Sequence, residues 1–154
     1  MNFELLKSQQ LEFIKTGKLL SVDYRIKLLN QLKSNIKSLE SEILKALHDD
    51  FGKSEFEAYS SEIGFIYQDI NETIKHIVKW SRPVRMRTAL SLFPSSAKIY
   101  SQPFGRVFII APWNYPFQLL IAPLIAAISG GNTALLKPSE LTPKVSAILN
   151  KLIS

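Results

Sequence analysis

The feature that most limits how this chain can fold is a run of thirty residues, bracketed by Arg106 and Lys137, that carries no charge. The run reads VFIIAPWNYPFQLLIAPLIAAISGGNTALL. A membrane-spanning helix needs about 20 apolar residues, so the length is available. However, prolines and the Gly130-Gly131 pair divide the run, and its longest clean stretch, Phe117 to Ser129, is too short and contains a proline. The sequence therefore favours short buried elements over a membrane span.

Each piece of the run fits an element of an α/β domain. Val107 to Ala111 is a wholly apolar run typical of a strand buried on both faces of a parallel sheet. Phe117 to Ser129 then forms a buried helix ended by the glycine pair, and Thr133 to Leu136 a second buried strand. Thr142 caps the next helix, with Pro143 at its first position. This order predicts the start of a doubly wound, Rossmann-like parallel sheet.

Amphipathic helices are predicted for the first half of the chain. Ser21 is an N-cap for a long helix that Gly52 ends. The apolar stripe of that helix is Leu32, Ile36, Leu39, Ile43 and Leu47. A second stripe, ending near Trp80, is Phe56, Tyr59, Ile63, Ile66, Ile70, Ile74 and Ile77. Phe3 to Ile14 is a third candidate helix, closed by Gly17.

Three segments follow from these patterns. Residues 1–80 form a helical segment, and residues 81–104 form an irregular connection with one strand candidate, Ala97 to Ser101. Residues 105–154 form the first β-α-β-α of a nucleotide-binding domain. Because two strands cannot close the core of such a sheet, we expect the chain to be the front part of a larger protein. Open strand edges predict poor solubility for this part alone.

Composition and charge exclude several classes of function. The chain has no cysteine, which excludes a thiol nucleophile, a disulfide framework and a cysteine metal site within it. The two histidines, His48 and His76, lie far apart, and no metal site is expected. The net charge of +6 includes one local basic cluster at 82–87, which is too small and lacks the aromatic residues of a nucleic-acid site. The polar N-terminus has no signal-peptide pattern, so a cytoplasmic location is expected.

Candidate functional residues follow the two predicted strands, where ligands bind in open α/β sheets. The primary amide of Asn114 is an uncharged donor that would stabilise an oxyanion, although an asparagine between prolines also suits a simple turn. Lys137 and Glu140 together would bind the hydroxyls of a ribose, or they are a solvated strand end before a helix. The residues alone leave both pairs of alternatives open.

The segment PWNYPFQLLIAPLIAAISGGNTALLKPSE resembles the first βαβ unit of the aldehyde dehydrogenase superfamily. Tyr115, directly after Asn114, and the short N-terminus resemble the class 3 branch, which includes fatty and aromatic aldehyde dehydrogenases. The resemblance extends over essentially the whole chain. It implies oxidation of an aldehyde substrate to a carboxylic acid with NAD or NADP, through a thiohemiacetal on a cysteine.

The resemblance also assigns roles to residues. Asn114 matches the asparagine that holds the oxyanion. The remaining matches are with the cofactor: the adenosine ribose for Lys137 and Glu140, and the backbone beside the cofactor for Ile110, Ala111, Pro112 and Trp113. Glu140 near a ribose 2′-hydroxyl would disfavour the phosphate of NADP there.

The same resemblance puts the cysteine nucleophile and the glutamate base beyond the equivalent of Ser154. The chain alone is therefore expected to be inactive, and the full-length protein is expected to be a homodimer without a nucleic-acid or membrane partner. The alternative function is a non-enzymatic helical interaction module, in which the thirty uncharged residues form a membrane-associated apolar hairpin.

Overall fold

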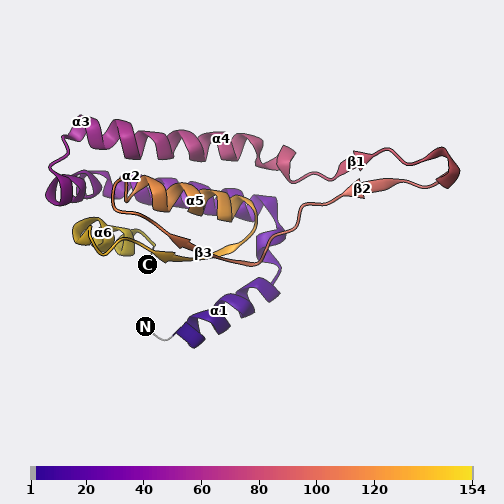
Figure 1. Cartoon of the computed structure of the whole chain (residues 1–154), viewed down its shortest axis with the longest axis horizontal. Coiled ribbons are helices and arrows are strands. Elements are labelled where there is room, and N and C mark those ends of the chain that lie inside the picture. Colours follow the sequence, from indigo (N-terminus) through magenta and orange to yellow (C-terminus); the bar gives the residue numbers. More distant parts are fainter. Residues whose placement is uncertain (1–2, 154) are drawn as a thin grey trace.

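Helices make up most of the first half of the chain in the computed structural model, which describes residues 3–153 (Figure 1). They are α1 (Phe3–Lys15), α2 (Val22–Phe51), α3 (Glu55–Ala58) and α4 (Gly64–Trp80), with a short 3₁₀ turn at Lys18–Leu20. The predicted ends of α2 are confirmed. The Ser21 hydroxyl accepts a hydrogen bond from the Tyr24 amide at 3.3 Å, and Gly52 ends the helix with a φ of 70°.

A π-helical turn at Tyr59–Ile63 joins α3 to α4 and changes which side chains face the core. The Gly64 amide bonds to the Tyr59 carbonyl, five residues back, so one extra residue is accommodated in the turn. The prediction that Phe56 belongs to the buried stripe is wrong, because this side chain is 84% exposed, and Tyr59 is also exposed. A regular helical period does not continue through a π-helical turn.

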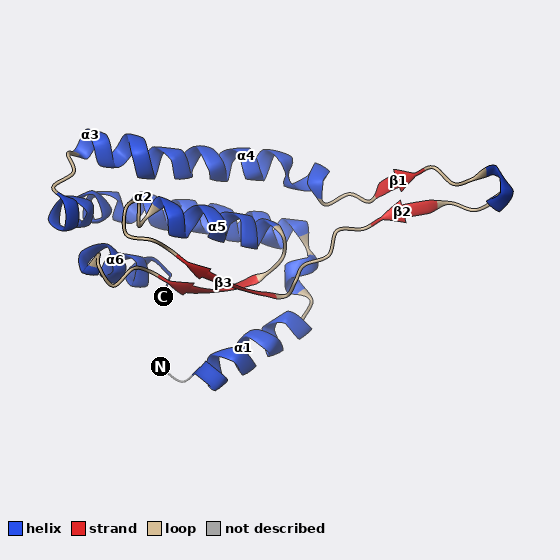
Figure 2. Cartoon of the chain, in the orientation of Figure 1, coloured by secondary structure: helices blue, strands red, loops and turns tan. Residues whose placement is uncertain are grey.

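The uncharged run folds as strand, helix and strand, as the sequence predicts (Figure 2). Its elements are β3 (Arg106–Ile110), α5 (Gln118–Ser129) and β4 (Thr133–Lys137), and α6 (Pro143–Ile153) follows. Strands β3 and β4 pair in parallel, with Arg106 opposite Thr133 and Ile110 opposite Lys137. Among residues 3–153, none of the helices is long and apolar enough to cross a membrane.

The expectation that the first strand is buried on both faces is wrong for this chain. In β3, Ile109 is buried, whereas Phe108 and Ile110 are 59% and 64% exposed. Successive side chains of a strand point to opposite faces. Helix α5 packs against β3 and β4 and covers one of these faces, so the alternate residues of β3 remain open.

One hydrophobic core connects the two halves of the chain. Helix α2 contacts α4, α5 and α6, and buried residues from all four helices belong to a single cluster. Helix α1 lies on the other side of the sheet from α2 and α5 in Figure 1, where the Gln10 side chain donates to the Ala134 carbonyl at 3.2 Å. The sheet and the loops at its ends are thus held by helices from both halves.

Residues 82–104 contain more regular structure than the sequence predicts. Strand β1 (Val84–Met86) pairs antiparallel with β2 (Ala97–Ile99), and a 3₁₀ turn at Leu90–Leu92 joins the two. The resulting hairpin projects from the body of the molecule (Figure 1), and its side chains are almost all exposed. Strand β1 lacked a clear signal, because it has only three residues and an arginine at its centre.

Two glycines give a matched test of backbone strain. Gly52 and Gly131 have φ values of 70° and 79°, in the region that favours glycine. A Cβ at Gly52 would meet no atom within 4 Å, whereas one at Gly131 would lie 3.0 Å from the Leu19 carbonyl oxygen. We expect Gly52→Ala to lower the free energy of unfolding by about 1–2 kcal/mol. Gly131→Ala should cost about 1–3 kcal/mol more, because the backbone of Leu19 must move. Urea titration checks this, and equal losses would contradict the role given to the close approach.

Candidate functional site

The parallel pairing of β3 and β4 brings the two predicted site segments to one edge of the sheet. Ile110 lies opposite Lys137, and the Ala111 amide donates to the Lys137 carbonyl at 3.1 Å. Both strands end at this point, so the loop 111–117 and the loop 138–142 leave the sheet side by side. The structure thus brings together at this edge all the residues that the sequence singled out.

The loop 111–117 begins and ends at buried residues and exposes most of the residues between them. Ala111 is buried, while Pro112, Trp113 and Asn114 are exposed, as is Ile110 at the end of the strand. The chain is irregular here, because Pro112 and Pro116 interrupt the backbone hydrogen bonding of a strand or helix. Asn114 is exposed at the carboxyl edge of the sheet.

Lys137 and Glu140 form a direct ion pair at the end of β4. Glu140 is fully exposed, and its hydrogen bond with Lys137 lowers the pKa of the carboxyl. The loop that carries them is fixed from within, because the Ser139 carbonyl accepts from the hydroxyls of Thr142 at 3.3 Å and Ser146 at 2.8 Å. An accessible ammonium and carboxylate match the donors and acceptors of a ribose, and the exposed faces of Ile110 and Trp113 provide nearby apolar surface. These groups are candidates to hold the adenosine part of a dinucleotide.

Two further residues of the site were not found from the sequence. Lys53, between α2 and α3, and Glu62, in the π-helical turn, form an ion pair with Nζ and Oε1 2.5 Å apart. The Lys53 side chain is 9% exposed and that of Glu62 is fully buried. The pair lies beneath the loop 111–117, where Lys53 Nζ donates to the Asn114 carbonyl at 3.4 Å. The sequence contains only a weak signal for Glu62, which directly precedes Ile63 of the predicted apolar stripe.

The start of α6 is held by a residue from the first half of the chain. The Asp50 carboxylate accepts from the amides of Lys144 and Val145, at 3.3 and 2.9 Å. Thr142 precedes Pro143 as predicted, but its hydroxyl donates to the Ser139 carbonyl instead of capping the helix. The prediction of Thr142 as the side-chain cap is therefore corrected to Asp50. An aspartate suits this place because a helix N-terminus favours negative charge.

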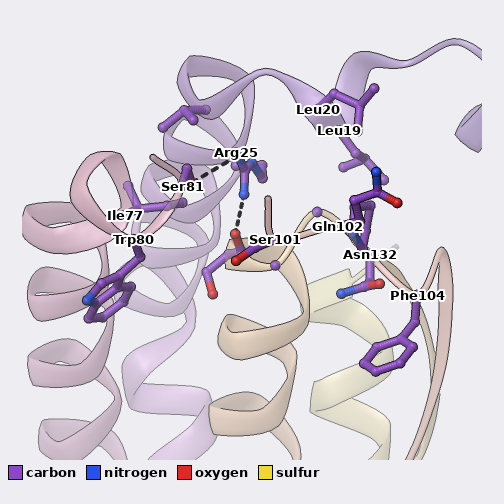
Figure 3. A pocket seen from close by; sticks show the side chains of 15 residues that line it. Leu19, Leu20, Arg25, Ile77, Trp80, Ser81, Ser101, Gln102, Phe104 and Asn132 are labelled. Carbon is purple, nitrogen blue, oxygen red and sulfur yellow. Dashed lines mark hydrogen bonds between the residues drawn. The ribbon is translucent and has the colours of Figure 1, made fainter. Parts of the chain in front are cut away.

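A cavity of about 420 Å³ lies elsewhere, at the edge where β4 begins (Figure 3). Its central polar group, the Arg25 guanidinium, donates to the Ser129 carbonyl and to the Ser81 hydroxyl. Burial lowers the pKa of this guanidinium. Because these bonds join α2 to the ends of α4 and α5, we interpret Arg25 as structural. The cavity is distinct from the edge that carries Asn114 and Lys137.

Two parallel strands joined by a buried helix, with polar groups at their carboxyl edge, define the start of a nucleotide-binding α/β fold. Residues 11–154 match the aldehyde dehydrogenase family. The chain is 45% identical over 142 residues to 4,4'-diaponeurosporen-aldehyde dehydrogenase of Staphylococcus aureus (strain NCTC 8325 / PS 47). It is 44% identical over 131 residues to aldehyde dehydrogenase family 3 member H1 of Arabidopsis thaliana. The chain therefore belongs to the aldehyde dehydrogenase family, and its resemblance to the class 3 branch is confirmed.

The solved structures agree. The substrate-bound state of Staphylococcus aureus AldH superposes with a TM-score of 0.94 and 43% sequence identity, over 99% of this chain and 33% of that one. The matches to the two relatives above include 92% and 85% of this chain. They include only 31% and 27% of the relatives. The chain thus spans about a third of the length of the proteins that it matches, and the predicted Rossmann-like fold is confirmed.

Proposed function

We propose that the whole protein to which this chain contributes oxidises aldehydes to carboxylic acids with NAD or NADP. The observation that carries the proposal is the register of β3 and β4, which brings the Asn114 loop and Lys137 to one edge in a chain of the aldehyde dehydrogenase family. A cysteine thiolate would attack the carbonyl carbon. Because the chain has no cysteine, that thiolate comes from outside these 154 residues, and the chain alone is inactive.

In this proposal Asn114 acts on the oxygen of the aldehyde. Its side-chain amide donates a hydrogen bond to the oxyanion that forms when the thiolate adds to the carbonyl. An amide suits this task because it stays uncharged and gives up no proton at neutral pH. The exposed position of Asn114 at the sheet edge supports the assignment, since a substrate can approach there.

The cofactor would lie along the same edge. When bound, NAD or NADP would supply the acceptor for the hydride that leaves the carbon of the thiohemiacetal, and water would hydrolyse the resulting thioester to the carboxylic acid and release the thiolate. Lys137 donates to a ribose hydroxyl and Glu140 accepts from one, while the backbone from Ile110 to Trp113 lines the approach. The Glu140 carboxylate disfavours a phosphate beside it, and this supports a preference for NAD.

The name of one relative supports a substrate class. The Staphylococcus aureus protein carries the name of a diaponeurosporen-aldehyde dehydrogenase, which supports an apolar aldehyde as substrate here. To test the function, the chain and the same chain with its downstream coding sequence restored are compared by NAD(P)H absorbance on short, aromatic and long apolar aldehydes. Activity in the longer protein alone is expected. Inactivity of the longer protein on every aldehyde would overturn the proposal.

Lys137→Met should weaken cofactor binding. Loss of a charge-assisted hydrogen bond of about 1.5–3 kcal/mol raises the KM for NAD about 10- to 150-fold, with a smaller effect on kcat.

The ion pair of Lys137 and Glu140 depends on pH with a definite sign. Because the pKa of Glu140 is lowered, its pair with Lys137 is intact at neutral pH and is lost as pH falls below the ordinary carboxyl range of about 4. Steady-state rates of the longer protein at varied NAD concentration and pH check both effects, with Lys37→Met, on the exposed surface of α2, as the control.

We further propose that the whole protein is a homodimer to which the hairpin of β1 and β2 contributes. Its exposed apolar pair Val84 and Ile99 would be covered by a second copy. In the longer protein, Val84→Lys with Ile99→Lys is expected to shift the mass in sedimentation from dimer toward monomer. Phe56→Lys, at an exposed site on α3, is the matched control. An unchanged mass in the hairpin variant would contradict the proposed interface.

A further inference from the structure

The buried pair of Lys53 and Glu62 contacts the backbone at both ends of residues 114–118, the asparagine loop. At the far end, Glu62 Oε2 accepts from the amides of Phe117 and Gln118, at 2.9 and 3.2 Å. At the near end, Lys53 Nζ donates to the Asn114 carbonyl at 3.4 Å. The two side chains are joined at 2.5 Å, so one connected group fixes the backbone on either side of the Tyr115–Pro116 turn.

A buried ion pair of Lys53 and Glu62 is more than the cap of helix α5 requires. Removing both charges from water costs free energy, and a pair of apolar side chains often stabilises a core as well as a buried ion pair does. A neutral serine or asparagine would be sufficient to cap α5. The charged pair adds a hold on the Asn114 carbonyl, and Lys53 Nζ also lies 4.4 Å from the centre of the Tyr115 ring.

The π-helical turn supplies the carboxylate. Glu62 and Ile63 are both fully buried, although they are adjacent in the helical segment. The wide turn directs Ile63 into the apolar cluster and Glu62 toward the start of α5. Irregular turns of this kind occur frequently at functional sites.

We propose that Lys53 and Glu62 are positioning residues, which hold the backbone at 114–118 so that the Asn114 amide meets the substrate oxygen. The inference rests on the proposed function. With the Asn114 carbonyl and the Phe117 amide both held, the side chain of Asn114 extends from a fixed backbone. Small displacements of a catalytic donor lower the rate strongly, and residues behind the donor determine its place.

The test uses the longer protein and three variants. The double variant Lys53→Met with Glu62→Gln removes both charges together, so neither charge is left buried and unpaired, and the glutamine oxygen still accepts from the start of α5. Lys53→Arg keeps the charge and the donors. Asp50→Asn is the matched control, because Asp50 accepts from two amides at the start of α6 in the same way but does not contact the asparagine loop.

The first readout is catalytic. The double variant is expected to lower kcat roughly 10- to 100-fold with the KM for NAD within about twofold of the parent. Lys53→Arg should restore most of kcat, and Asp50→Asn should change kcat by less than about twofold. An equal loss in Asp50→Asn and the double variant would reduce the pair to a structural role and overturn the proposal.

The second readout needs no activity. In protein labelled with ¹⁵N-asparagine, the side-chain amide signal of Asn114 is assigned by its absence from Asn114→Ala. A shifted or broadened signal in the double variant, with no change in Asp50→Asn, supports the positioning role even where the parent oxidises no aldehyde. A changed Asn114 signal in a protein that oxidises no aldehyde would overturn the proposed function but not the positioning role. An unmoved Asn114 signal in the double variant overturns the inference whatever the activity.

Discussion

Asn114→Ala is expected to lower kcat for aldehyde oxidation about 10²- to 10³-fold in the longer protein, which corresponds to about 2.7–4 kcal/mol of transition-state stabilisation. The amide donates to an oxygen that carries full negative charge only after the thiolate has added. Its loss therefore affects the transition state more than the bound aldehyde. The KM for the aldehyde should change much less than kcat.

Steady-state NADH production across a range of aldehyde concentrations separates these two constants. Asn30→Ala is the matched control, because Asn30 is an exposed asparagine on α2 whose side-chain amide donates to the Ile26 carbonyl of the same helix at 3.0 Å. We expect this control to keep the parent kcat. A loss confined to KM in Asn114→Ala would show that the amide contributes to ground-state binding alone, and the oxyanion role would be wrong.

Glu62→Ala is expected to lower the free energy of unfolding by about 3–5 kcal/mol. It removes the partner of the buried Lys53 ammonium and leaves the amides of Phe117 and Gln118 without their acceptor. Both effects occur where the side chains are shielded from water, so solvent replaces the lost groups poorly. Since whole domains are stable by about 5–15 kcal/mol, the loss is a large share of the total.

Chemical denaturation followed by circular dichroism measures this effect. Asp50→Ala removes a comparable helix cap at a less buried position and should cost about 0.5–2 kcal/mol, the usual range for such caps. The comparison isolates the contribution of the buried lysine. Similar losses in the two variants would mean that the Lys53 ammonium finds water or another partner when Glu62 is gone.

Local patterns in the sequence were sufficient to predict much of the fold. Ser21 and Gly52 give the ends of α2 because caps and left-handed positions depend on neighbouring residues only. The order β3, α5, β4, α6 follows from breaks in one apolar run. Asn114, Lys137 and Glu140 were found as candidates because they follow buried strands, and the parallel pairing brings them to one edge.

Contacts between distant parts of the chain could not be predicted. Glu62 reaches the amide of Phe117 across 55 residues, and Asp50 reaches that of Val145 across 95. Each carboxylate has the sequence context of an ordinary exposed residue on a helix. Its role depends on where α5 and α6 begin relative to α2 and α4, and no local pattern contains that information.

The π-helical turn at Tyr59–Ile63 makes the number of residues in this segment a requirement of its own. Shortening the turn by one residue would give a regular helix without the wide turn that directs Glu62 toward the start of α5 and Ile63 into the apolar cluster. The Glu62 carboxylate would then lose its present place between Lys53 and the start of α5. We therefore expect substitutions at the exposed Ser60 to be tolerated, and an insertion or deletion within these five residues to displace Glu62.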